Sequence, residues 1–203
     1  MDTKKIHVAG FSLIFLVIAA SRIFATTSMQ ETIYYVSGFG FLALLSLIFV
    51  IAIPLFVKYL RSSFTAYLMA NRRWIGIYVF IFALLHVLAV YNSLFGWDIN
   101  AIVNGPNAPF LALGSLAFLI LASMTATSND ASVRILGRRW KKLHMLVYVA
   151  LALILVHSYN IGLVFMSNDA VALGVIAIAV IIVALKLRMT LAARFGAQPK
   201  QPL

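Results

Sequence analysis

The chain has 203 residues, of which 64% are hydrophobic and only 10% are charged, so its composition indicates an integral membrane protein rather than a soluble domain. It contains no cysteine, which excludes disulfides, thiol catalysis, iron–sulfur clusters and covalently attached c-type haem. The net charge of +11 does not predict nucleic-acid binding, because the basic residues fall in short segments between apolar runs.

Six apolar segments are predicted to be membrane-spanning helices, since each is close to the about 20 residues that a bilayer requires. They cover residues 6–25, 33–57, 74–91, 110–127, 143–160 and 170–187. Lys4 and Lys5 precede the first segment as they would in a signal peptide, but the apolar run continues past Ala19 and Ala20. We therefore expect a retained signal-anchor helix. The predicted fold class is all-α, a six-helix bundle that forms a single transmembrane domain over residues 1–203.

Lysines and arginines fall on one side of this six-span arrangement. They are Lys4, Lys5, Lys58, Arg61, Arg72, Arg73, Arg134, Arg138, Arg139, Lys141, Lys142, Lys186, Arg188, Arg194 and Lys200. The opposite side holds Arg22 alone, together with Glu31, Asp98 and Asp169. Because cytoplasmic loops are enriched in Lys and Arg, we predict that both termini are cytoplasmic. The predicted location is the bacterial cytoplasmic (inner) membrane, among membrane lipids.

The segment after Leu187 is too short for a folded domain and contains no GxGxxG sequence and no Walker-type glycine loop, so no nucleotide-binding domain is predicted. A donor of electrons would then have to be another molecule. The polar stretch 92–107 faces outside in this arrangement, where it is either a docking face or only a connector.

Histidines lie in or at the edge of the predicted spans, and their spacing defines two levels along the third and fifth spans. His86 follows Arg72 by 14 residues, and His157 follows His144 by 13 residues. At about 1.5 Å per residue, each spacing covers about 20 Å of helix. Both helices run from the cytoplasm outward, so His86 is predicted opposite His157 at an outer level. His144 is predicted opposite Arg72 and Arg73 at an inner level.

Two facing imidazoles inside an apolar bundle suit a b-type haem with both axial positions filled, which favours electron transfer over oxygen activation. The residues expected to pack on the macrocycle are Phe82, Ala83, Leu85, Val90, Leu153 and Ile154. Gly76 and Ala83 are expected to allow close approach of the cofactor or of a helix. An alternative is open for every histidine, including His7: an intramembrane imidazole can simply form a hydrogen bond between helices.

The helical phase separates the two histidines of the fifth span. At about 100° per residue, a spacing of 13 residues is about 140° away from a common face. Either the helix contains a π-bulge or bend between His144 and His157, or only one of them faces the cofactor. His157 is the preferred ligand. His144 either faces an inner site or lies at headgroup level beside Lys141 and Lys142.

Sequence motifs in the third to fifth spans resemble the ferric-reductase-like transmembrane superfamily. The similarity rests on RRWIGIYVFIFALLHVLAVY at residues 72–91 and on LGRRWKKLHMLVY, followed by a second histidine, within residues 113–159. A weaker match extends back through residues 37–59 and the first span. In particular, the chain resembles the haem-binding membrane subunits of bacterial periplasmic methionine sulfoxide reductase systems.

This resemblance implies specific cofactors and partners. The superfamily typically places two histidines on each of two helices and stacks two b haems, whereas here Arg72 or Arg73 occupies the position of one inner histidine. One haem at His86 and His157 is therefore implied, and a second on His144 is left open. The resemblance also implies FMN as a cofactor, quinol or a cytoplasmic flavin reductase as electron donor, and a periplasmic molybdenum-containing reductase as acceptor. Basic residues at the inner mouth, Arg72 and Arg73 among them, would suit a phosphate group or a redox partner.

The predicted function is transmembrane electron transfer by a subunit that does not itself reduce the sulfoxide. One alternative is a stand-alone transmembrane reductase of ferric iron or oxygen. Another is a non-redox transporter or assembly factor in which the histidines are structural.

Overall fold

A computed structural model describes residues 3–195, and this part of the chain is all-α, as predicted. The first half contains α1 (Lys4–Phe24), α2 (Ser28–Leu60), α3 (Ser63–Ala70) and α4 (Arg72–Ala89), which continues into the π-helical turn η1 (Val90–Leu94). The second half contains α5 (Ile99–Asn104), α6 (Ala108–Ala126), α7 (Asp130–Leu136), α8 (Arg138–His144), α9 (Val147–Ile161) and α10 (Asp169–Phe195).

Six of the described helical segments are long and apolar enough to cross a membrane, which confirms a multi-pass membrane protein. Several are longer than predicted because their polar ends are helical as well. Thr27 caps α2 through a hydrogen bond from the Gln30 N–H, so this helix begins five residues earlier than predicted, and it continues to Leu60. The fifth span begins at Arg138 rather than 143, since the basic segment before His144 forms α8.

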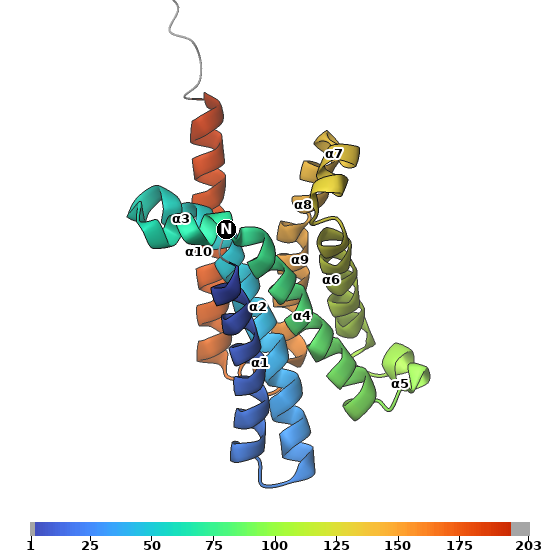
Figure 1. Ribbon diagram of the computed structural model, residues 1–203. Coiled ribbons are helices and arrows are strands. Elements are labelled where there is room, and N and C mark those ends of the chain that lie inside the picture. The colour runs from blue at the N-terminus through green and yellow to red at the C-terminus, as the bar shows by residue number, and fades with distance from the viewer. Residues whose placement is uncertain (1–2, 196–203) are drawn as a thin grey trace, which may run out of the picture.

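The helices form two groups, one of α1, α2, α4 and α10 and the other of α6 and α9, which meet along α2 and α4 (Figure 1). Helices α1, α2 and α4 lie side by side, α10 packs against α2, and α6 pairs with α9. The short helices α3 and α7 lie at the end of the bundle that holds the N-terminus, whereas α5 lies at the opposite end (Figure 1). The C-terminal end of α10 lies at the N-terminal end of the bundle as well.

Charges are distributed unevenly between these two ends. Arg22, the exception to the predicted charge bias, lies at the end opposite the N-terminus, where its Nε is 3.2 Å from Glu31 Oε1. Its charge is thus paired locally. The other cations fall at the end that carries α3, α7 and α8, apart from Lys200 and the side chain of Arg194, which lie outside the described part. The prediction that this end is cytoplasmic follows from the same bias.

Helix α2 is the centre of the bundle, because it is apolar on all sides and contacts helices from both groups. Phe39, Ile51 and Ile53 are at most 1% exposed, and they pack among side chains of the neighbouring helices. The other spans each bury one stripe and leave an apolar face exposed. This arrangement places the residues of α2 within reach of α4 and of the α6–α9 pair.

Candidate functional site

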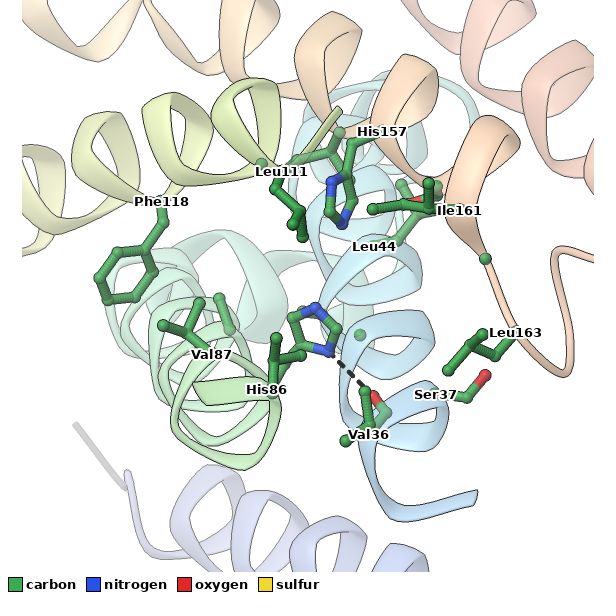
Figure 2. A pocket seen from close by; sticks show the side chains of 18 of the residues that line it. Val36, Ser37, Leu44, His86, Val87, Leu111, Phe118, His157, Ile161 and Leu163 are labelled. Carbon is green, nitrogen blue, oxygen red and sulfur yellow. Dashed lines mark hydrogen bonds between the residues drawn. The ribbon is translucent and has the colours of Figure 1, made fainter. Parts of the chain in front are cut away.

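A cavity of about 220 Å³ lies between α2, α4, α6 and α9 in the half of the bundle away from the N-terminus. Its walls are mainly apolar, and they include Leu44, Phe118 and Ile154. Two imidazoles, those of His86 and His157, project into it from opposite sides (Figure 2). In a mainly apolar cavity, the few polar groups are the ones that orient a ligand.

His86 reaches the cavity from α4 and is held by the backbone of α2. Its Nδ1 lies 2.9 Å from the carbonyl oxygen of Val36 (Figure 2). The ring also lies against Gly40, where a Cβ atom would be 2.8 Å from Nδ1. A larger residue than glycine at position 40 would therefore displace the ring.

His157 reaches the cavity from α9 and is held in the same way by the backbone of α6. Its Nδ1 lies 2.9 Å from the carbonyl oxygen of Phe110. A Cβ atom on Gly114 would be 2.6 Å from the same nitrogen. In both helices the glycine follows the carbonyl by four residues, so the histidine packs where one helical turn lacks a side chain.

These hydrogen bonds determine which ring nitrogen can bind a ligand. A carbonyl oxygen can only accept, so Nδ1 of His86 and Nδ1 of His157 must each carry the proton. Each Nε2 then keeps its lone pair. A second-shell carbonyl on Nδ1–H is the arrangement that orients histidines bound to metals in proteins.

The two rings face each other at a separation that suits one metal ion between them. Their centroids are 6.3 Å apart and the ring planes are at 89°. Two metal–imidazole bonds of about 2 Å, plus about 1 Å from each nitrogen to its ring centre, give about 6 Å. The described residues contain no group of three or more His, Cys, Asp or Glu placed to hold a bare metal ion. Two opposed imidazoles instead match the axial positions of a metal whose other ligands come from a planar macrocycle.

The expected lining of the site is only partly correct. Ala83, Val90 and Ile154 line the cavity, whereas Phe82 lines a different one on the side of α1, and Leu85 and Leu153 line neither. A Cβ atom on Gly76 would have no neighbour within 4 Å, so no helix or cofactor site packs closely against this glycine. The glycines with that role, Gly40 and Gly114, were missed, although glycine within an apolar span is a signal of close packing.

At the inner level, the structure separates the two arginines. The guanidinium of Arg73 turns outward, where Nη2 is 2.8 Å from Asp130 Oδ1 and both side chains are largely exposed. Arg72 turns inward, and its Nε donates to the carbonyl oxygen of Val50 at 3.2 Å. It lies close enough to His144 and Lys186 for their charges to interact.

His144 does not lie on the same straight helix as His157. Helix α8 ends at His144, two residues in a turn follow, and α9 begins at Val147. The His144 ring stacks on Trp140 with centroids 3.9 Å apart, and its Nε2 is 3.4 Å from the Thr127 hydroxyl. Of the two histidines, only His157 lines the cavity, and His144 is half-buried near the end of the bundle.

His7 has an interhelical role of the kind considered for every histidine. Its Nδ1 is 3.1 Å from the hydroxyl of Tyr78, and its ring packs edge-on against Trp74 at 5.0 Å. Tyr78 in turn fills the space above Gly10. The three aromatic residues therefore connect α1 to α4, away from the cavity that holds His86.

Comparison with known proteins gives two kinds of similarity. The family model described as "Ferric reductase like transmembrane component" matches residues 37–155, a range that includes His86 and His144 and ends just before His157. A protein-methionine-sulfoxide reductase heme-binding subunit MsrQ from Brucella anthropi is 45% identical over 83 residues, 40% of this chain and 37% of the relative. The MsrQ of Brucella ovis is 35% identical over 106 residues, 52% of this chain and 48% of the relative.

These matches cover less than half of each curated relative's length. No solved structure is similar to the chain.

Proposed function

Because the chain belongs to the ferric reductase-like transmembrane component family, we propose that it is a haem-binding subunit that carries electrons across the membrane. The observation that carries the proposal is the pair of opposed histidines, His86 and His157, each with its Nδ1 bound to a backbone carbonyl. The names of the Brucella relatives, both heme-binding subunits, support it independently.

In this proposal, His86 and His157 hold one b-type haem through their Nε2 atoms. A haem with two axial histidines supplies reversible one-electron transfer and has no open position for oxygen. The chain itself orients the two imidazoles and surrounds the site with apolar side chains. The carbonyls of Val36 and Phe110 fix the imidazole tautomers, and the apolar walls exclude water, which lowers the local dielectric and favours a buried redox group.

The inner level is the proposed side of electron supply. Arg72, His144 and Lys186 gather there, with Arg73 and Asp130 at the rim. A cationic inner mouth suits an anionic donor, such as a flavin phosphate or an acidic reductase surface, and a quinol dissolved in the membrane is the other donor class. His144 does not bind a haem in this scheme, because its ring would first have to leave its stack on Trp140.

The outer level is the proposed side of electron delivery. Helix α5 and its flanking turns stand beside the cavity, and Trp97, Ile99 and Val103 are more than half exposed there. An exposed aromatic and aliphatic patch of this kind suits a protein partner. We propose a periplasmic methionine sulfoxide reductase as that partner, following the names of the relatives.

An absorption spectrum of the purified protein tests the haem proposal. Protein expressed with a haem precursor should show a Soret band that shifts, and α and β bands that sharpen, when dithionite is added. Colourless protein, with the helical content intact by circular dichroism, would instead favour a transporter or assembly factor with structural histidines. A b-type spectrum together with rapid reoxidation by oxygen alone would favour a stand-alone reductase.

A further inference from the structure

Proline 54 lies inside α2, and it leaves one carbonyl of that helix without its usual donor. In an α-helix, the N–H of residue 54 would donate to the carbonyl of residue 50, but proline has no N–H. Val50 is 8% exposed, so water does not readily replace the missing donor. The Nε of Arg72, on α4, lies 3.2 Å from the Val50 oxygen. An arginine from the neighbouring helix therefore satisfies the carbonyl that Pro54 leaves open.

This contact has a counterpart at the other end of the same helix pair. His86, also on α4, donates from Nδ1 to the Val36 carbonyl on α2. Arg72 and His86 are 14 residues apart on α4, and Val36 and Val50 are 14 residues apart on α2. Fourteen residues make about four helical turns, so each pair returns to nearly the same face about 21 Å along its helix. Two side chains of α4 thus donate hydrogen bonds to carbonyls of α2, and these bonds join the antiparallel helices at two matching levels.

We propose that Arg72 is a positioning residue, whose bond to the carbonyl freed by Pro54 sets the register of α4 on α2 and thereby presents His86 to His157. The part of this inference that concerns His86 as a ligand rests on the proposed function, whereas the register itself does not. Arg72 acts here through the donor geometry of its guanidinium and not through its charge.

The spacing explains why register matters at this site. His86 has to meet the Val36 carbonyl and the bare surface of Gly40 at once. A slip of one residue along α2 moves the contacts by about 1.5 Å and about 100° around the helix, which removes both. A hydrogen bond from a side chain to a single carbonyl is made in one register only. The Arg72 bond sets that register at the end far from His86.

The test uses Pro54→Ala to restore the missing N–H. Arg72→Met removes the donor and the charge, Arg72→Gln keeps a neutral N–H donor, and Arg72→Lys keeps the charge without the planar fork. Arg61→Met is the matched control, because Arg61 Nε also donates to a carbonyl of α2, that of Lys58. This bond lies within one exposed turn and does not connect two helices. The chain has no cysteine, so spin labels can be introduced at Leu45 of α2 and Leu88 of α4, both exposed.

In haem-free protein, the distance between these labels should shift or broaden in Arg72→Met. It should stay shifted in the double variant Pro54→Ala/Arg72→Met, because the restored N–H satisfies the Val50 carbonyl within α2 and joins no two helices. It should be unchanged in Arg61→Met. In haem-loaded protein, Arg72→Met should lose haem about tenfold faster, since a buried carbonyl left without its donor from α4 costs about that factor. The double variant should recover little of this loss, and Arg72→Gln should retain more haem than Arg72→Lys.

Two results would overturn the inference. If Arg72→Met left both the label distance and the haem retention unchanged, Arg72 would not set the register. If Pro54→Ala restored the wild-type label distance to Arg72→Met, the functional property would be a satisfied Val50 carbonyl and not the bond between the helices. Should wild-type protein bind no haem while the label distances still followed the expected pattern, the proposed function would fail and the register role would stand.

Discussion

His86 and His157 come from different helices, yet each is fixed by the same combination of one carbonyl and one glycine. Val36 and Gly40 on α2 hold the first ring, and Phe110 and Gly114 on α6 hold the second. Each ring is therefore positioned by a helix other than its own. This arrangement connects all four helices around the cavity, so the geometry of the ring pair depends on the packing of the whole site.

The glycines beside the rings give the first prediction. Gly114→Ala places a Cβ where Nδ1 of His157 now lies within 2.6 Å, and overpacking of this kind costs about 1–3 kcal/mol. We expect weaker haem retention and an altered low-spin electron paramagnetic resonance signal. Gly76→Ala is the control, because its Cβ would meet no atom within 4 Å and alanine favours the helix by up to about 1 kcal/mol. Equal haem retention in the two variants would mean that the ring does not depend on Gly114.

The inner histidine gives the second prediction. His144 stacks on Trp140 and contacts Thr127, so His144→Ala should leave most of the haem bound, at about one haem per chain. Pyridine haemochrome analysis measures this ratio. About two haems per chain in the wild type, with one lost in His144→Ala, would instead place a second haem at the inner level.

The exposed ion pair at the rim gives a third prediction. Arg73 and Asp130 are 2.8 Å apart, but their side chains are 43% and 74% exposed, so the pair contributes at most about 1 kcal/mol. Asp130→Asn should change the thermal unfolding temperature little, and the small change should vanish in high salt. A large loss of stability that persists in salt would show that the pair orders α7 against α4.

The orientation in the membrane gives a fourth prediction. Single cysteines can be placed at Asn100 on α5 and at Ala131 on α7, since the chain has none and both positions are exposed. A membrane-impermeant maleimide added to intact cells or spheroplasts should label Asn100→Cys and leave Ala131→Cys unlabelled until the membrane is opened. The reverse pattern would contradict the cytoplasmic placement of the basic end.

Much of the fold was predictable, because a bilayer admits few structures. Hydropathy alone located the six spans, since a backbone in lipid must satisfy its own hydrogen bonds. The shared depth of His86 and His157 followed from counting residues along parallel helices. The mismatch in helical phase between His144 and His157 indicated either a bend or a single histidine that faces the cofactor, and of the two only His157 lines the cavity.

The rest depends on which helices are neighbours, and the spacing of residues within one helix does not contain this information. The carbonyls of Val36 and Phe110 are backbone groups that any sequence supplies, so nothing marks them before α2 and α6 are placed. Pro54 leaves the Val50 carbonyl without a donor in its own helix, but the donor that replaces it, Arg72, follows only from the packing of α4 on α2. Span ends were underestimated where polar residues such as Arg138 extend the helix.

The most direct test of the account is the dithionite-reduced minus oxidised spectrum of three single variants beside the wild type. His86→Ala and His157→Ala each remove one of the opposed Nε2 atoms and should lose the b-type spectrum. His7→Phe also removes an intramembrane imidazole, one bound to Tyr78 at 3.1 Å, and should keep it. A full b-type spectrum in either His86→Ala or His157→Ala would contradict the central claim that these two histidines hold the haem.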